Sequence, residues 1–168
     1  MGFVEQFEGK ARVFGDDINT DQIIQGRYLQ LLDYTEMAKH TFEVIRPDFA
    51  TVASKGDIVV AGRNFGSGSS REEAPMVLKT LGIGCVLAES FSRIFYRNAF
   101  NIGLPALIVK GLSQQVREGM HLKVDLIKGE VTLEESGTTF SFSRIPSKML
   151  ELLRAGGAVA WYRQTSPT

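Results

Sequence analysis

The 168-residue sequence predicts an α/β fold in a single domain, residues 1–168, with a parallel sheet and an added antiparallel β element. Two observations predict it. Between residues 57 and 109, three short apolar runs alternate with two helical patterns, and this βαβαβ order implies parallel strands with right-handed crossovers. Between residues 121 and 142, polar and apolar residues alternate, which is typical of antiparallel strands.

The segment before the parallel unit is less regular. Residues 10–14 alternate as a strand does, and the run ends in a polar loop that continues to Asp21. Residues 35–44 carry apolar side chains at a weak helical spacing, and Pro47 must end that helix nearby. We expect one strand, one polar loop and one helix here.

The remaining elements follow from their boundaries. In the parallel unit the strands are apolar on both faces, which is typical of strands covered by other elements on both sides. We predict strands at 57–61, 85–88 and 104–109, with helices at 74–81 and 92–100. We then predict strands at 121–126, 130–133 and 138–142, a last helix at 146–154 closed by Gly156 and Gly157, and a frayed tail at 164–168.

The composition argues against several classes of partner. Nineteen Lys and Arg balance nineteen Asp and Glu, so no surplus positive charge attracts nucleic acid or anionic lipid. No basic stretch precedes an apolar segment at the N-terminus, and no run approaches the ~18 apolar residues of a membrane span. We expect a cytoplasmic protein with no nucleic-acid or membrane partner.

The metal-binding residue types are sparse. Cys85 is the single cysteine, which excludes an intrachain disulfide and a cysteine-only zinc or iron-sulfur site within this chain. It falls in a predicted buried strand, so we expect a packed apolar side chain. His40 and His121 have no second ligand at metal spacing, and we expect both at the surface or at caps. No metal site is predicted.

The loop at residues 62–71 carries the strongest functional signal. Three glycines and three serines lie between a buried strand and a helix, where they free the backbone for a positive φ and for close approach to a ligand. Such a turn aims backbone N–H groups and the positive end of a helix dipole at one place, so we predict an anion site. Arg71 adds a planar guanidinium suited to a carboxylate.

Other interpretations of this loop explain less. No lysine follows Gly66 or Gly68 as a P-loop requires, and Arg71 stands where the dinucleotide motif needs its third glycine. A plainer alternative is that Ser69 or Ser70 caps the helix while a following glutamate completes a capping box. Capping alone does not explain the two glycines together with the arginine.

Four motifs together carry a family resemblance. They are DDINTDQII at 16–24, GRNFGSGSSRE at 62–72, SFSRIFYRN at 90–98 and GLP at 103–105. With them, nearly the whole chain resembles the small subunits of 3-isopropylmalate dehydratase, and more broadly the swivelling β/β/α domain of the aconitase superfamily. The resemblance implies a hydro-lyase of leucine biosynthesis that isomerises a hydroxy di- or tricarboxylate by dehydration and rehydration.

The resemblance also implies partners and site residues. It implies a large subunit that carries a [4Fe-4S] cluster, in a heterodimer or heterotetramer, with self-association possible for the isolated chain. By resemblance, Ser69 is the catalytic base that takes a proton from carbon, and Arg71 holds a substrate carboxylate. The implied substrate-binding set also contains Asn64, Gly68, Ser70 and Asp21.

The chemistry of Ser69 independently requires a partner. A hydroxyl titrates near the pKa of bulk water, about 15.7. A helix terminus contributes at most ~2 kcal/mol, little more than one pKa unit at ~1.36 kcal/mol each. The loop alone cannot generate an alkoxide, and a chain with one cysteine cannot hold the cluster. Both arguments place the rest of the active site on another subunit, with no cofactor in this chain.

A segment after the first motif bears on the substrate. In the family, an arginine in this segment accompanies homoaconitase substrates, and apolar residues accompany isopropylmalate. The corresponding residues here are Arg27, Tyr28, Leu29, Gln30 and Leu31. Gln30 stands at the arginine position, so an extra carboxylate would lose a charged hydrogen bond worth ~1.5–3 kcal/mol. We expect conversion of 2-isopropylmalate to 3-isopropylmalate.

Three alternatives stay open. Gln30 fits neither family pattern, which leaves 2,3-dimethylmalate or a homoaconitase-type substrate. The chain could also be a non-catalytic, anion-binding regulatory module. The third alternative is a homo-oligomeric scaffold in which the loop at residues 62–71 only forms the capped start of a helix.

Overall fold

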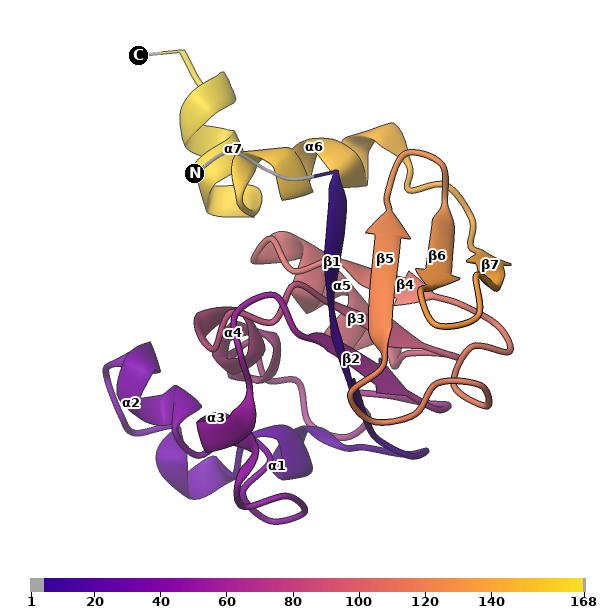
Figure 1. Cartoon of the computed structure of the whole chain (residues 1–168). Coiled ribbons are helices and arrows are strands. Elements are labelled where there is room, and N and C mark those ends of the chain that lie inside the picture. Colours follow the sequence, from indigo (N-terminus) through magenta and orange to yellow (C-terminus); the bar gives the residue numbers. More distant parts are fainter. Residues whose placement is uncertain (1–4, 168) are drawn as a thin grey trace.

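The computed structural model describes residues 5–167. Within them, seven strands form one mixed sheet in the order β4-β3-β2-β1-β5-β6-β7 (Figure 1). The strands are β1 (Gln6–Val13), β2 (Ile58–Ala61), β3 (Cys85–Ala88), β4 (Ala106–Ile108), β5 (His121–Asp125), β6 (Glu130–Leu133) and β7 (Thr139–Ser141). The predicted α/β class with an added antiparallel element is confirmed.

The predicted βαβαβ unit is present as β2, α4 (Glu73–Thr80), β3, α5 (Arg93–Asn101) and β4. Its strands pair in parallel, and β1 joins them parallel to β2. Every residue of β2 and β3 is buried because the two faces contribute to different apolar clusters. Val59 faces the cluster packed against the helices, whereas Val60 faces the cluster inside the curled sheet.

The second half of the sheet is antiparallel. Strand β5 pairs antiparallel with β1, and β6 and β7 follow as hairpins. The sheet curls, so that a Cβ on Gly111, just after β4, would lie 3.8 Å from the ring of Phe140 in β7. Leu107 and Phe142 belong to the same enclosed cluster, which fills this curl.

Between β1 and β2 the chain makes an excursion of short helices. They are α1 (Thr20–Ile23), the 3₁₀ helix η1 (Gly26–Tyr28), α2 (Tyr34–Ala38) and α3 (Phe49–Val52). The predicted helix over 35–44 is therefore wrong in its second half. Phe42 has a φ of 56°, and its amide donates to the carbonyl of Ile23 instead of continuing a helix. This turn buries the Phe42 ring between Phe14 and Phe49, at centroid distances of 4.2 and 4.8 Å.

Two helices end the described chain. Helix α6 (Ser147–Ala155) ends at Gly156, whose φ of 91° supplies the predicted glycine stop. It is not the last helix, because α7 (Ala158–Thr165) follows, and Gln164 and Thr165 are helical rather than frayed. The Lys148 ammonium lies 3.4 Å from the centroid of the Trp161 ring, which ties α7 to α6. Residues 1–4 lie outside the described range, and so does residue 168, the last residue of the predicted tail.

A charged network fixes β1 against β2. Asp57, only 3% exposed, accepts from Arg12 Nε at 2.7 Å. Arg12 also contacts Glu118 at 3.2 Å, and Glu118 accepts from the Val13 amide and from Arg46. Burial raises the pKa of Glu118, but the hydrogen bonds from Arg46 and Val13 outweigh burial and leave this pKa lowered. No helix between residues 5 and 167 combines the length and the apolar character needed to cross a bilayer.

Candidate active site

Two loops lie side by side where β1 and β2 end. Because these strands are parallel neighbours, their carboxyl ends meet at one edge of the sheet, where α/β folds bind ligands. The loop after β1 and the loop at residues 62–72 are joined by backbone hydrogen bonds. The Asp17 amide donates to Arg63, Gly66 donates to Ile18, and Thr20 donates to Ser67, at 2.7–2.8 Å. The first two motifs of the sequence therefore form one structural unit.

The 62–72 loop has the backbone conformation that its glycines predict. Gly66 and Gly68 have φ of 81° and 94°, and Asn64 adopts φ 58° without being glycine. The Asn64 amide donates to Ser90 Oγ at 2.8 Å, and its Nδ2 donates to Asp17 Oδ1 at 3.1 Å. Asp17 itself has a φ of 57°. These two left-handed residues are thus held against each other, a strain typical of functional sites.

The serines lie exposed before helix α4. Gly68, Ser69 and Ser70 are all exposed. Helix α4 begins at Glu73 with no side-chain hydrogen bond at its cap, so the helix-capping interpretation of Ser69 or Ser70 is wrong. Neither serine hydroxyl makes a hydrogen bond to any other residue between 5 and 167. The Ser69 carbonyl, in contrast, accepts from the hydroxyl of Thr20 at 3.0 Å.

Arg71 is held by the opposite loop. Its side chain is 17% exposed, and Nη1 donates to Asp21 Oδ1 at 2.5 Å and to the Ile24 carbonyl at 3.0 Å. A Cβ on Gly26 would lie 3.4 Å from Nη2, so the glycine at the start of η1 lets the chain pass close to the guanidinium. In the described part of the chain, Nε and Nη2 donate no hydrogen bond. The structure thus brings Asp21 and Arg71 into contact.

The predicted specificity segment is anchored at its start. Arg27 Nη2 lies 3.7 Å from Glu43 Oε2, and Gln25 Nε2 donates to the same oxygen at 3.3 Å. The Tyr28 ring stacks on His40 with centroids 3.7 Å apart, and His40 Nδ1 lies 3.3 Å from Glu43 Oε1. A hydrogen bond from Tyr28 and one from His40 lower the pKa of Glu43. The His40 side chain is 31% exposed, so His40 lies at the surface as predicted, and its stacking on Tyr28 adds a contact that the sequence did not predict.

The rest of the segment differs from its anchored start. Leu29 is partly buried against the core, whereas Gln30 and Leu31 are exposed. Leu31 is 37% exposed, and the following residue, Leu32, is fully exposed. The structure does not bring Gln30 into a hydrogen bond with the other candidate residues among those described.

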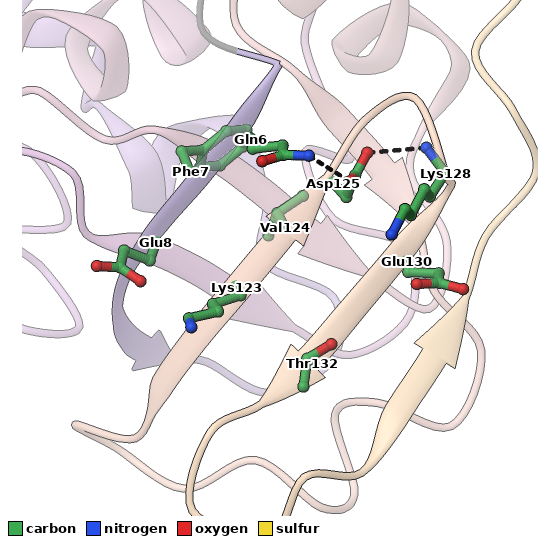
Figure 2. A pocket seen from close by; sticks show the side chains of 9 residues that line it. All are labelled: Gln6, Phe7, Glu8, Lys123, Val124, Asp125, Lys128, Glu130 and Thr132. Carbon is green, nitrogen blue, oxygen red and sulfur yellow. Dashed lines mark hydrogen bonds between the residues drawn. The ribbon is translucent and has the colours of Figure 1, made fainter.

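Two hollows differ in their relation to these residues. A recess of about 350 Å³ lies beside Asp21, Gly26 and Arg27. A larger hollow of about 590 Å³ lies on the outer face of β1, β5 and β6 (Figure 2) and contains none of the predicted site residues. There Asp125 accepts from Gln6 Nε2 at 2.9 Å and from the Lys128 amide at 2.8 Å. Because Asp125 is paired and the other lining side chains are mostly charged or polar, this face has the character of a solvated sheet surface.

The described residues do not fit a metal cluster. Between residues 5 and 167, no three His, Cys, Asp or Glu side chains gather at metal-binding distance. Cys85 is fully buried in β3, and burial raises the pKa of its thiol well above the ordinary value. A buried thiol of this kind is protonated and inert, as expected for a packed apolar side chain.

Sequence reasoning missed three residues that shape the site. Thr20, Asp17 and Glu43 act on Ser69, Asn64 and the specificity segment, respectively, through the contacts above. Thr20 and Asp17 belong to the 16–24 motif, so their neighbourhood was signalled although their partners were not. Nothing in the sequence pattern marked Glu43.

Comparisons with known proteins agree with this geometry. The family model for the aconitase C-terminal domain matches residues 1–111. The chain is 47% identical over 154 residues to the 3-isopropylmalate dehydratase small subunit of Halothermothrix orenii, covering 92% of this chain and 93% of the relative. It is 45% identical over 160 residues to the methanogen homoaconitase small subunit of Methanothermobacter thermautotrophicus, covering 95% and 92%.

A solved structure is similar throughout. The crystal structure of a 3-isopropylmalate dehydratase from Methanocaldococcus jannaschii superimposes with a TM-score of 0.90 at 40% identity. The match covers 95% of this chain and 94% of the other. The two-part sheet and the paired loops therefore belong to a known architecture.

Proposed function

The chain belongs to the aconitase C-terminal domain family, as a small subunit of the 3-isopropylmalate dehydratase type, and from this we propose that it supplies half of a split hydro-lyase site. The reaction is the conversion of 2-isopropylmalate to 3-isopropylmalate by dehydration and rehydration. The observation that carries the proposal is an exposed serine on a glycine loop beside a guanidinium that retains unused donors.

Ser69 is proposed as the base. In the dehydration step, Ser69 Oγ acts as an alkoxide and takes the proton as the C–H bond breaks. The electron pair of that bond forms the new double bond, and the substrate hydroxyl leaves the adjacent carbon as hydroxide, which a Lewis acid on the partner subunit would accept. In rehydration, hydroxide adds to the carbon that lost the proton, and Ser69 Oγ returns the proton to the carbon that lost the hydroxyl. The positive end of α4 and the cationic Arg71 both favour negative charge at this loop. Exclusion of water when the site closes against a partner strengthens both effects.

Arg71 is proposed to hold a substrate carboxylate through Nε and Nη2. Asp21 then serves the site by orienting Arg71, because a carboxylate placed directly against an anionic substrate would repel it. Gly68, Ser70 and Asn64 belong to the same loop. Backbone N–H groups and side-chain donors of this loop complete the proposed anion-binding site.

The proposal includes a large subunit that bears the [4Fe-4S] cluster. Its support is that the described residues of this chain offer no ligand set, together with the relatives' designation as small subunits. The loss of the hydroxyl group is consequently not a step that the side chains of this chain provide. A cytoplasmic location stays a prediction.

Two observations bear on the substrate, and they favour different candidates. Gln30 supplies no guanidinium for a further carboxylate, which favours a branched alkyl group. Identity to the homoaconitase relative, 45%, is close to that of the dehydratase relative, 47%, so a homoaconitase-type substrate is the second candidate.

The test is reconstitution with a cluster-bearing large subunit under anaerobic conditions. We expect Ser69→Ala to abolish turnover while the complex still forms, with Ser147→Ala as the control, since Ser147 is an exposed serine at the start of α6 and belongs to none of the proposed site residues. A panel of isopropylmalate, dimethylmalate and homocitrate then defines the substrate. Unchanged turnover in Ser69→Ala would remove Ser69 from the mechanism. A chain that binds no such subunit would favour the regulatory module instead.

A further inference from the structure

Thr20 contacts the serine loop, which is the part of the 62–72 loop that carries Ser67, Ser69 and Ser70. It is the first residue of α1, is 4% exposed, and its Oγ1 donates to the Ser69 carbonyl at 3.0 Å across 49 residues of sequence. Its backbone amide donates to the Ser67 carbonyl at 2.8 Å. A Cβ on Gly68 would lie 3.6 Å from Oγ1. Thr20 therefore fastens both neighbours of the glycine at which the loop bends.

The local structure of α1 does not require this hydroxyl. Asn19 caps α1 by accepting from the Gln22 amide, and the Gln22 side chain accepts from the Asn19 amide in return. The capping box is thus complete without Thr20. A buried hydroxyl must nevertheless be paired, and the pairing in this structure is with the loop rather than with α1.

We propose that Thr20 is a positioning residue for Ser69: its hydroxyl fixes the Ser69 peptide so that Oγ is presented to the substrate. This inference rests on the proposed function of Ser69. The exposed segment after Gly68 has no other anchor before Arg71, because the described hydroxyls of Ser69 and Ser70 are unbonded. Small errors in the placement of a reacting group can cost about a hundredfold in rate.

The first experiment measures the loop directly, by amide hydrogen exchange of residues 67–72. The variants are Thr20→Val, which keeps the shape and removes the hydroxyl, and Thr20→Ser, which keeps the hydroxyl. We expect faster exchange in Thr20→Val and near wild-type exchange in Thr20→Ser. The matched control is Thr41→Val, since Thr41 is 1% exposed and its hydroxyl bonds the local carbonyl of Ala38 at 2.7 Å. Equal exchange in Thr20→Val and wild type would overturn the inference.

The second experiment measures turnover in the reconstituted complex. We expect Thr20→Val to lower kcat about tenfold or more with KM within about twofold, whereas Thr20→Ser recovers most of the rate. An equal loss in both Thr20 variants would show a merely structural role. If Thr20→Val does not fold, Thr20→Ala against Thr20→Ser makes the same comparison.

The outcomes separate the two proposals. If Ser69→Ala keeps full activity, the proposed function fails, and the exchange experiment still decides whether Thr20 holds the loop. If Ser69→Ala is inactive and Thr20→Val is fully active, only the positioning role fails.

Discussion

Replacing Gly66 by alanine tests the architecture of the serine loop. Gly66 has a φ of 81°, and a Cβ there would lie 2.3 Å from Cγ of Phe95. Phe95 is 1% exposed and packs edge-on against Phe65 with ring centroids 5.1 Å apart. The ring has no free space to move into, so either the loop or α5 must shift.

The magnitude follows from two costs. A left-handed conformation costs a residue with a Cβ about 1–2 kcal/mol, and inserting a methyl group into a packed core costs about 1–3 kcal/mol. We expect Gly66→Ala to lower the free energy of unfolding by about 2–5 kcal/mol. Gly68→Ala separates the two costs: its φ is 94°, but its nearest contact would be 3.6 Å away. We expect about 1–2 kcal/mol for Gly68→Ala.

The assay is thermal unfolding followed by circular dichroism, in which each kcal/mol lowers Tm by about 2–4 °C for a chain of this size. Gly15→Ala is the control, since a Cβ on Gly15 would have no atom within 4 Å. We expect Gly15→Ala to be near neutral and Gly66→Ala to be the least stable variant. A Gly66→Ala variant as stable as Gly68→Ala would refute the argued contact with Phe95.

Three further predictions concern the site and the charged network. Arg71→Lys should raise KM for the substrate about tenfold or more, because an ammonium cannot replace the two-pronged hydrogen bonding of a guanidinium, and a charged hydrogen bond contributes ~1.5–3 kcal/mol. Steady-state kinetics with an unchanged KM would contradict this. Gln30→Arg should shift the ratio of kcat/KM values from isopropylmalate toward homocitrate, and an unaltered ratio would separate this segment from specificity. Because the folded-state pKa of Glu118 is lowered from 4.5, its contribution to stability is present at neutral pH and is lost as pH falls through that folded pKa. Urea unfolding should therefore show Glu118→Gln less stable than wild type at pH 7 with the difference shrinking below about pH 4.5, and a constant difference would argue against this linkage.

The parallel unit was predictable because a strand that is buried on both faces is apolar at every position. All four residues of β2 are fully buried, so the run is continuously apolar and its ends are sharp. The alternation in β5 was equally informative, since Leu122 and Val124 face the enclosed cluster while Lys123 faces solvent.

The helical excursion was not predictable in the same way. Its course depends on the packing of Phe42 and Phe49 against Phe14, which is distant from both in sequence, and on a left-handed Phe42 that no propensity favours. Helix α7 was missed because two glycines after α6 resemble a terminus, although Gly157 instead begins the next helix.

The candidate site was predictable as a place and not as a set of contacts. Glycines at 66 and 68 signalled the bend, and their φ values confirm it. The pairing of Arg71 with Asp21 joins residues 50 apart, and spacing along a chain carries no information on such partners. The roles of Ser69 and Arg71 remain predictions for the reconstituted enzyme.

Strand β1 pairs with β2 on one edge and with β5 on the other, and this has a consequence for biosynthesis. Of the seven described strands, β1 is translated before the others, yet Gln6 meets Asp125 only after 119 further positions have been translated. Until then one long edge of β1 is open to pairing with other nascent chains, which is a recognised route to aggregation. The order of synthesis therefore leaves β1 without its second neighbour until β5 has emerged.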